Sequence, residues 1–447
     1  MKHIRKLKRS IVFPLVLCLL LSLLLGVLSS CAPAAPFRPA QPGDHWTVGF
    51  GKAVITPQDW QTYPYTMGGY GINNPVEGVL DDMWARAVYL DDNTGRGGVL
   101  LISLDCIGLL SKDVDAIRAR IDVPCRAVHV MFTHTHAAVD TLGLWGEALV
   151  TGRRQAYFDF LADQAAAAAK AAYAARTDGQ LLFGQCGADD LQRDSRPPVV
   201  YSRELSAWHF VPDDSSLNTL YLVHFSAHPG TMRSDNRYIS ADYPYFLGQR
   251  LAEHGADFLF INGAIGAIGV NAPLPDQRQN CMNTGYELAD LTLSMDFHAA
   301  PAEVNDATES YTIRVDNDLY KVAAFLNVFS ANVKNESIRT QTSLLEIGGI
   351  LCVLVPGELF PEIAYGPLNK GDPPTIAAVL SRSDFLVFGL ADEELGYILP
   401  PTEFVLNKNL PYIKEAPNHY HETNSVGPTA AARLITALQT LQKRCGV

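Results

Sequence analysis

Two histidines, two residues apart, follow an apolar stretch in the segment VMFTHTH. In an extended chain, residues i and i+2 point to the same side, so His134 and His136 are predicted to face one site. A third histidine, His228, follows the apolar stretch YLVHF, and Pro229 ends that predicted strand. Because imidazole nitrogens are common zinc ligands, this set indicates metal chemistry.

A carboxylate and a phenol stand beyond two further apolar stretches. Glu358 follows LCVLVPG, at the predicted start of a helix, and Tyr397 follows FLVFGLADEELG. Ligand sites in layered α/β proteins form where the carboxyl ends of strands converge. Two or three imidazoles and a carboxylate from such ends would make a zinc site with one position open for water.

Each of these residues also has a purely structural interpretation. A single strand histidine is more often a hydrogen-bonded core residue, Glu358 could cap a helix N-terminus, and Tyr397 could simply pack. Five other histidines are assigned structural roles, and one of them, His224, shares a strand face with His228: His129, His209, His224, His254 and His298.

A glycine-rich loop follows the predicted strand in FLFINGAIGAIGVN, residues 258–271. It has the position of a binding loop, but it carries no Lys, Ser, Asp or Arg before Asn271. It also lacks the glycine spacing and the lysine of nucleotide-binding loops, which argues against ATP or NAD. We therefore assign Gly266, Gly269 and Asn271 to a substrate-facing loop.

The elements that must position these residues alternate along the chain. Apolar runs rich in Val, Ile, Leu and Phe predict strands within residues 84–92, 97–105, 125–136, 219–229, 257–263, 348–357 and 384–391. Helical patterns occupy residues 112–121, 154–177, 243–254 and 428–444, and the alanine-rich part at 162–175 predicts a covering helix. The alternation predicts an α/β fold, with mixed β-sheets layered with helices in one large domain. Residues 276–345 give no clear pattern.

The N-terminus has the layout of a secretory signal, with a basic head and an apolar run in residues 1–30. A retained membrane helix is the alternative interpretation. The segment LSSC resembles a bacterial lipobox, in which Cys31 becomes the lipidated first residue. Residues 31–45 then predict a Pro/Ala-rich tether. The expected location is that of an exported, membrane-anchored bacterial lipoprotein, at the cell surface or in the periplasm.

Charge and cysteine content narrow the function further. The chain has 35 basic and 47 acidic side chains, a formal net charge of −12 and no basic stripe, so nucleic acid is not an expected partner. An exported compartment permits disulfides, but no cysteine spacing indicates a thiolate metal site. Cys106 and Cys352 lie in apolar strands, where a buried free thiol is the more common state.

Several short motifs, taken in order, carry a family resemblance: VGFGKAVITP, MGGYG, FTHTH, SAHPGTM, PGE and GYILPPTEF. The chain resembles the neutral/alkaline non-lysosomal ceramidase family from about Thr47 to Pro428. The resemblance implies a ceramidase-like catalytic domain over residues 46–447, without the C-terminal immunoglobulin-like domain of typical members. It implies zinc-dependent hydrolysis of a linear amide bond in N-acylsphingosine or a related N-acyl lipid, with a zinc-bound water as nucleophile.

The resemblance also assigns roles to individual residues. The implied zinc ligands are His134, His228, Glu358 and Tyr397. Three further residues are implied to act on the substrate: His136 beside the metal, Arg193 in LQRDSRP and Tyr420 in YHETNSVGP. Of these, His136 or Tyr420 would move protons or stabilise the oxyanion.

The chain departs from the family at two motifs. The family's His-Thr-His-Ser-Gly-Pro is HTHAAVD here, and its Gly-Asp-x-Ser-Pro-Asn loop is GAIGVN. Ala267 therefore stands for the aspartate, Gly269 for the serine and Val270 for the proline. Two hypotheses follow: an amide hydrolase that works without this serine, or a ligand-binding lipoprotein of the same fold that has lost catalysis.

Overall fold

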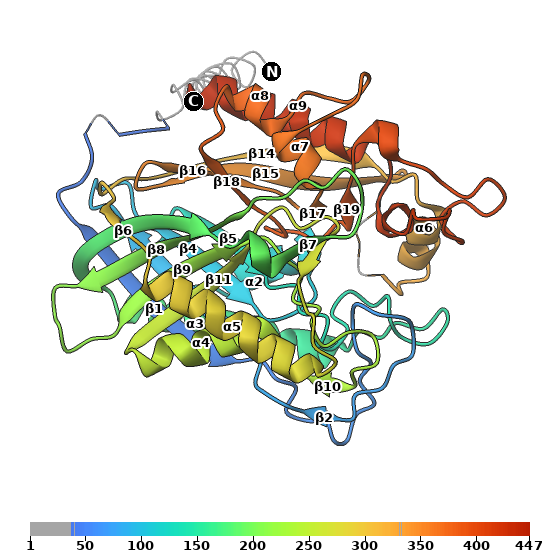
Figure 1. Ribbon diagram of the computed structural model, residues 1–447, viewed down its shortest axis with the longest axis horizontal. Helices are drawn as coiled ribbons and strands as arrows, with labels where there is room; N and C mark the ends of the chain where they lie inside the picture. Colours follow the sequence, from blue (N-terminus) through green and yellow to red (C-terminus); the bar gives the residue numbers. More distant parts are fainter. Residues whose placement is uncertain (1–36, 40, 330, 332) are drawn as a thin grey trace, which may run out of the picture. The chain divides into compact units, whose positions relative to one another are not determined.

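Two β-sheets lie face to face at the centre of the fold, and helices cover their outer faces (Figure 1). The computed structural model describes residues 37–447, with residues 40, 330 and 332 excepted. Residues Arg38–Val447 form one compact unit. The predicted α/β class, with mixed sheets layered against helices, is confirmed.

The larger sheet is mixed. In spatial order its strands are β11 (Ala256–Asn262), β9 (Thr219–Phe225), β8 (Glu204–Pro212), β6 (Thr177–Gly187), β1 (Trp46–Val54), β3 (Trp84–Asp91), β4 (Val99–Leu104) and β5 (Ala127–Phe132), and β13 (His298–Ala299) pairs with β6. The pairs β11–β9 and β4–β5 are parallel, and the other pairs are antiparallel. Both outermost pairs are therefore parallel. The carboxyl ends of their strands point toward the candidate site described below.

The smaller sheet has four strands. In spatial order they are β14 (Val304–Arg314), β15 (Ser337–Ile347), β16 (Ile350–Leu354) and β18 (Phe385–Phe388). Its inner face packs on the larger sheet through side chains such as Leu354 and Phe388, which meet Trp208 and Leu222 in one buried cluster. Strands β16 and β18 are buried on both faces, so their sequences read as continuous apolar runs.

Helices form the two outer layers. On the far side of the larger sheet lie α2 (Ser111–Arg118), α3 (Gln155–Ala174), α4 (Tyr243–Glu253) and α5 (Gln277–Leu293). Beyond the smaller sheet lie α7 (Pro361–Tyr365), α8 (Ile376–Leu380) and α9 (Ala430–Cys445), while α6 (Asp318–Phe325) lies to one side (Figure 1). The predicted covering role of the alanine-rich segment is met by α3, whose buried face includes Ala165, Ala168 and Ala172.

Short elements complete the loops around the site. Three two-stranded pairs form: β2 (Gly78–Val79) with β10 (Tyr238–Ile239), β7 (Gln192–Asp194) with β12 (Ile268–Val270), and β17 (Glu358–Leu359) with β19 (Tyr397–Ile398). Single 3₁₀ turns span Asp189–Leu191, Pro401–Glu403 and His421–Asn424.

The larger sheet curls until its two ends meet. The Ser103 hydroxyl of β4 donates to the Phe260 carbonyl of β11 (2.7 Å), and the Asn262 side-chain amide donates to the Thr133 carbonyl just after β5 (2.6 Å). The segments that follow β5 and β9, far apart in strand order, are therefore brought together. This closure places His134 and His136 beside His228.

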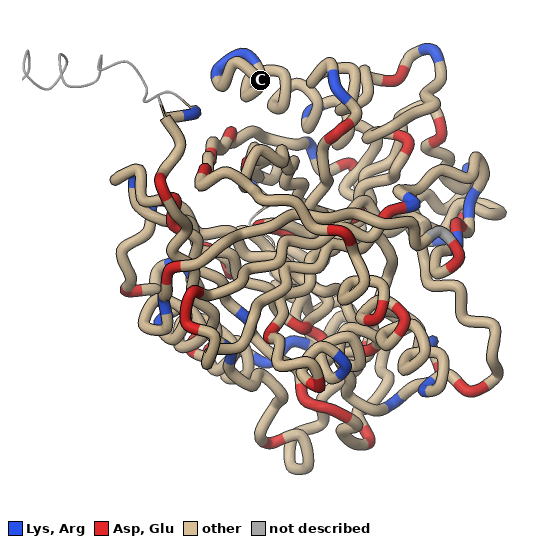
Figure 2. Tube along the Cα trace, turned by 60° about the vertical axis from the view of Figure 1, so that its left-hand side comes forward, with Lys and Arg blue, Asp and Glu red and all other residues tan. Residues whose placement is uncertain are grey.

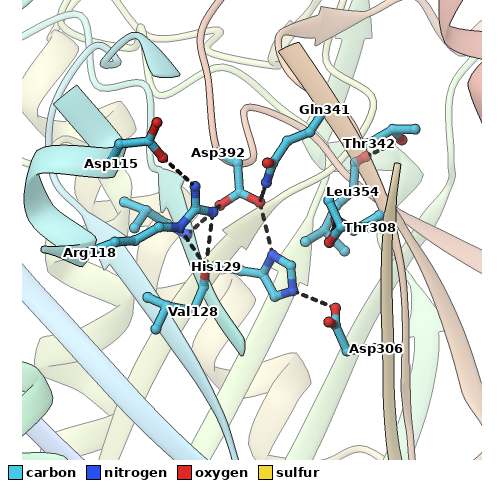
Figure 3. Close-up of polar contacts among 12 residues, drawn as sticks. Asp115, Arg118, Val128, His129, Asp306, Thr308, Gln341, Thr342, Leu354 and Asp392 are labelled. Atoms are coloured by element: carbon cyan, nitrogen blue, oxygen red, sulfur yellow. Dashed lines mark hydrogen bonds and ion pairs between the residues drawn. The ribbon is translucent and has the colours of Figure 1, made fainter. Parts of the chain in front are cut away.

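A buried charge cluster fastens β5 to the smaller sheet (Figure 3). The two ring nitrogens of His129 lie 2.9 Å from Asp392 Oδ2 and 2.7 Å from Asp306 Oδ1. The other Asp392 oxygen accepts from the Val130 amide and lies 2.6 Å from Arg118 Nη2. The structural role predicted for His129 is consistent with these contacts.

Each strand and helix predicted from sequence patterns is present, but other elements were missed. Residues 276–345, which give no clear pattern, hold α5, β14, α6 and β15. The strands β14 and β15 are rich in polar residues, and β14 lies at the edge of the smaller sheet. Strands β1, β6 and β8 also lie outside the predicted set.

The remaining predictions concern the N-terminal segment, membrane-spanning helices, the cysteines and the distribution of charge. The signal, Cys31 and residues 31–36 of the tether lie outside the described residues. None of the described helices is long and apolar enough to cross a membrane. The six cysteines from Cys106 to Cys445 that the structure describes are free thiols. Figure 2 shows basic residues dispersed among acidic ones on the visible part of the described chain.

Candidate active site

Three imidazole rings converge where the segments after β5 and β9 meet. The ring centroids lie 4.9 Å apart for His134 and His136, 5.2 Å for His134 and His228, and 5.5 Å for His136 and His228. One nitrogen from each ring lies within 4.8 Å of the others. The three histidines predicted to share one site therefore do so, and they could hold a metal ion together.

The approach of His134 and His136 has a different cause from the one predicted. Strand β5 ends at Phe132, and His134 adopts a left-handed backbone conformation with φ 63°. The two rings are therefore brought to one side by a turn and not by extended geometry. A non-glycine residue in this region carries conformational strain, which is often found at functional sites.

Backbone carbonyls orient two of the three rings. Nδ1 of His134 lies 2.6 Å from the Ile107 carbonyl, and Nδ1 of His228 lies 2.7 Å from the Ile268 carbonyl. A carbonyl can only accept a hydrogen bond, so each Nδ1 carries the proton. In a neutral ring, Nε2 then presents its lone pair to the site, as in histidines that bind metals.

The carboxylate of Glu358 lies against both lone-pair nitrogens. Its Oε2 atom is 2.7 Å from Nε2 of His228 and 3.5 Å from Nε2 of His134. Burial raises the pKa of Glu358, but His134 and His228 outweigh it and hold the pKa below its usual value. Burial alone would lower the pKa of His228, but the hydrogen bond to Glu358 outweighs burial. The pKa of His228 is therefore raised above its usual value. A proton or a cation must therefore lie between these acceptors.

Glu358 is paired directly with Tyr397. The two residues face each other in the parallel pair β17–β19. The prediction that Glu358 begins a helix is wrong, because α7 begins at Pro361 and Phe360 occupies its N-cap position without a side-chain cap. Burial, and then the Glu358 carboxylate, raise the pKa of the Tyr397 phenol well above its usual value.

His136 is the least satisfied of the three imidazoles. Both of its ring nitrogens are buried and have no hydrogen-bond partner among the described residues. Its pKa is lowered well below the usual value, first by burial and then by His134 and His228. The ring of Tyr70, from the MGGYG motif, packs edge-on against it at 4.6 Å. A buried polar group without a partner is costly, so His136 is poised to meet a ligand.

The glycines of the loop after β11 differ in what surrounds them. A Cβ atom at Gly263 would lie 2.0 Å from Ser226 Oγ, and one at Gly266 would lie 2.4 Å from the Phe360 ring, so both positions need glycine for packing. A Cβ atom at Gly269 would meet no atom within 4 Å. The position at which the motif resemblance implies a serine therefore borders open space among the described residues. Ala267 has φ 65°, a conformation that suits Asp or Asn better than Ala.

The main cavity, with a volume of about 780 Å³, opens beside these groups. Of the predicted site residues, its lining includes His136, His228, Gly269, Tyr397, Tyr420 and Arg193. Gly266 packs behind the wall. The Asn271 side chain donates to the Asp190 carbonyl, and neither residue belongs to the lining.

Two further cavities adjoin the main one. A small cavity of about 40 Å³ is lined by His134, Glu358 and Glu394, and it shares Tyr397 and Tyr420 with the main cavity. A surface groove of about 820 Å³ begins on the other side of Tyr420 and has many apolar residues in its lining, among them Ile72, Leu144, Trp145, Leu319 and Ile413. Tyr420 thus lies where the three spaces meet.

Sequence reasoning missed two residues that border the site. His421 lines the main cavity, and its ring lies 4.6 Å from that of Tyr397. Burial, and then Arg196, lower its pKa to about 4. Glu394 lines the small cavity, and burial, followed by Glu358, raises its pKa to about 8. The signal for Glu394 was the acidic run DEE, which lies between a buried strand and Tyr397.

The fold and the site together define an α/β protein with a histidine centre able to hold a metal. Among solved structures, the chain is similar to neutral ceramidase from Pseudomonas aeruginosa, with a TM-score of 0.70 and 15% sequence identity over 90% of this chain and 75% of that one. It is also similar to a ceramidase complexed with C2, with a TM-score of 0.70 and 14% identity over 90% of this chain and 76% of the other.

These likenesses define the fold as ceramidase-like. No protein-family model matches the sequence, and no curated protein matches it. The resemblance drawn from the short motifs is therefore confirmed at the level of the fold, at an identity where ordinary sequence comparison finds no relative.

Proposed function

We propose that the protein is a zinc-dependent hydrolase of a linear amide bond in an N-acyl lipid, of ceramidase type. The observation that carries the proposal is the unsatisfied histidine centre, with Glu358 between two lone-pair nitrogens and His136 unpartnered, in a ceramidase-like fold. The residues fit zinc, which prefers imidazole and carboxylate ligands and keeps an open position in catalytic sites.

Two ligand sets would suit the ion. The first is the predicted set of His134, His228, Glu358 and Tyr397; the second is the three imidazoles alone. We favour the first because Glu358 Oε2 lies 2.7 Å from Nε2 of His228 and 3.5 Å from Nε2 of His134, whereas neither ring nitrogen of His136 has a hydrogen-bond partner among the described residues. Zinc held there would supply Lewis acidity toward the amide carbonyl and lower the pKa of a water molecule.

The remaining residues handle protons and hold the substrate. His136 lines the cavity, and neither of its ring nitrogens has a partner among the described residues, so it can accept a proton from an attacking water and return it to the leaving amine. Burial raises the pKa of the Tyr420 phenol, which therefore stays protonated and can donate a hydrogen bond to the developing oxyanion. This scheme requires no serine, so Gly269 is compatible with turnover.

The cavities suit an amide with one polar end and one apolar end. The main cavity is lined by polar groups such as Ser195 and Thr231, and the adjoining groove offers Trp145, Leu319 and Ile413. An acyl chain in the groove and the polar part in the main cavity would place the amide near Tyr420. Export and anchoring through Cys31 would bring such a site to a membrane, and this proposal rests on the sequence alone.

The decisive experiment measures zinc and turnover on one preparation. We expect one zinc ion per chain and release of fatty acid from N-acyl amide substrates, with activity lost on chelation and recovered on adding zinc. A zinc-loaded protein that hydrolyses none of a varied panel of N-acyl amides would contradict the hydrolase proposal.

The His136→Ala variant separates the two ligand sets. In the predicted set it keeps one zinc per chain and loses turnover, because the proton carrier is gone. In the three-imidazole set it loses the zinc as well. The exposed His254, which lies outside the site, gives the matched control His254→Gln, which keeps both zinc and activity.

The second candidate function is ligand binding without catalysis. The specific observation in its favour is the loop itself, where Ala267 and Gly269 replace the Asp and Ser of the family. This candidate predicts saturable binding of an N-acyl amide with no turnover, and an effect of His136→Ala on affinity alone.

A further inference from the structure

Among the residues that the structure describes, no carboxylate lines the main cavity. Across the whole chain, acidic residues outnumber basic ones by 47 to 35, yet this lining contains two arginines, Arg193 and Arg233, and no Asp or Glu. Its other polar groups are hydroxyls and imidazoles, such as Ser195, Thr231 and His421. A cavity lined by one sign of charge concentrates ligands of the opposite sign.

Arg193 is held beside the vacant position of the loop. In the antiparallel pair β7–β12 its partner is Gly269, so its side chain rises on the side where a serine would stand. The Arg193 side chain is exposed and makes no hydrogen bond or ion pair with the described residues. Arg196, three residues later, is different: it is buried and pairs with Glu422 at 3.0 Å.

Arg233 is tied to the same short segment. Its Nη2 atom donates to the Ala272 carbonyl at 3.0 Å, three residues beyond Gly269. Three residues of extended chain span about 10 Å, so the backbone of Arg193, opposite Gly269, and the guanidinium of Arg233, at Ala272, are held within about that distance along the wall. The nearby Asp235 carboxylate accepts from Gln277 at 3.0 Å and makes no ion pair with Arg233 within the described chain.

The two positions at which the loop departs from the family motif contribute to the positive charge of the cavity. Ala267 and Gly269 both line the cavity, and the resemblance places an aspartate and a serine there. An aspartate at residue 267 would put a negative charge into the wall, and a serine at residue 269 would fill the space beside Arg193. Their absence leaves a wider cavity in which the full charges of the described lining are the positive ones of Arg193 and Arg233.

We propose that the substrate is an amide bearing an anionic group, a carboxylate or a phosphate, which Arg193 and Arg233 bind at the cavity wall. The inference rests on the proposed amide hydrolase function and defines its substrate class. Guanidinium groups suit this role because their planar donor pairs match both anions. The anionic group then fixes the polar end of the substrate while the acyl chain extends toward the groove.

The test compares substrates that share one acyl chain. N-decanoylglycine carries a carboxylate, N-decanoyl-phosphoethanolamine a phosphate, and N-decanoylethanolamine no charge. We expect kcat/KM of the zinc-loaded protein to be at least about tenfold higher for one of the anionic substrates than for the neutral one. Whether the carboxylate or the phosphate is preferred identifies the anion.

Charge-removing variants locate the anion. Arg193→Gln and Arg233→Gln should each lower the anionic-to-neutral ratio of kcat/KM about tenfold. The matched control is Arg339→Gln, an exposed arginine of β15 outside the cavity, which changes the net charge equally and should keep the wild-type ratio. A wild-type ratio near one, or a ratio unmoved by both cavity variants, overturns the inference.

Binding to metal-free protein separates this inference from the proposed function. Calorimetric titration should show tighter binding of N-decanoylglycine or N-decanoyl-phosphoethanolamine than of N-decanoylethanolamine, and Arg233→Gln should remove the difference. If no substrate is hydrolysed but this difference is seen, the hydrolase proposal fails and the anion site stands. Equal binding of all three compounds overturns the anion site whatever the turnover.

Discussion

The structure contains two buried histidine clusters on neighbouring stretches of chain, and they are satisfied in opposite ways. His129 on β5 has a carboxylate at each ring nitrogen, at 2.9 Å and 2.7 Å (Figure 3). Seven residues later, His136 has no partner at either nitrogen among the described residues. Burial alone therefore does not separate structural histidines from functional ones. What distinguishes these two histidines is that both ring nitrogens are paired in one and neither is paired in the other.

The two clusters also differ in whether their charges and lone pairs are balanced by groups within the cluster. Around His129, an imidazolium and Arg118 balance Asp392 and Asp306, so the cluster is complete without any further ion. The site cluster has three imidazoles and one carboxylate whose lone pairs face one another. Protonation can satisfy only part of this set, whereas a divalent cation can satisfy its lone pairs together. The first cluster is expected to control stability, and the second to control metal binding.

The largest expected effect is the loss of zinc from the site cluster. His134→Ala removes a predicted ligand, so zinc affinity should fall by more than about a hundredfold, beyond what loss of a residue supporting a ligand costs. Activity toward N-acyl amides should fall below detection. Elemental analysis and turnover assays on the purified variant measure both effects.

The His254→Gln variant is the control for that experiment, since it removes an imidazole from the surface. Far-ultraviolet circular dichroism should show that both variants fold. If folded His134→Ala still bound one zinc ion per chain, His134 would not be a ligand. The distinction between a structural cluster and a metal-binding cluster would then fail.

The next effect concerns the stability that the complete cluster provides. His129→Leu leaves two carboxylates buried without their partner, which should lower the free energy of unfolding by about 3–5 kcal/mol. Urea unfolding of metal-free wild-type and variant proteins measures the difference. Asp306→Asn, at the more exposed end of the cluster, should cost less, about 1 kcal/mol. A His129→Leu variant as stable as the wild type would contradict the assigned role.

The complete cluster should also make stability depend on pH. Burial lowers the pKa of His129, but Asp392 and Asp306 outweigh it and raise the pKa to about 10. Burial raises the pKa of Asp392, but His129 and Arg118 hold it at about 2. The histidine contribution is complete below a pH of about 6.5, the pKa in the unfolded chain, and disappears as pH rises through about 10.

The aspartate contribution has the opposite sign. It is complete above a pH of about 4, the usual pKa of Asp, and disappears as pH falls through about 2. The stability difference between metal-free wild-type protein and His129→Gln should therefore be largest between about pH 4 and 6.5 and shrink on both sides. Urea unfolding across this range checks the profile, and a difference that grows toward pH 10 would contradict it.

Much of the fold and of the candidate site could be predicted from strand patterns and motifs in the sequence. The apolar runs ending near His134, His228 and Tyr397 are buried strands of the two sheets, so the idea of convergent strand ends led to residues that the structure brings together. The sequence carries no signal of the curl that joins β4 to β11, because this closure rests on single contacts such as that of Ser103 with Phe260.

The polar parts of the site were harder to predict. Glu358 stands in a two-residue strand paired with Tyr397, and so short an element leaves no periodic pattern. Glu394 reaches the site from a loop and His421 from the start of a 3₁₀ turn, and their burial depends on partners distant in sequence. The strands β14 and β15 were missed because tertiary packing, and not local apolar content, holds them in the smaller sheet.

The smallest expected effect tests how far the open region around the site cluster extends. Gly269 and Gly266 lie three residues apart in one loop, but only Gly269 faces open space. Gly269→Ser should change the free energy of unfolding by no more than about 0.5 kcal/mol, because its Cβ meets nothing. Gly266→Ser should cost about 1–3 kcal/mol, because its Cβ lies 2.4 Å from the Phe360 ring. Urea unfolding of this matched pair compares a packed glycine with a vacant one. If Gly269→Ser is as destabilising as Gly266→Ser, then residue 269 does not border free space, and the wide cavity beside Arg193 is not present in solution.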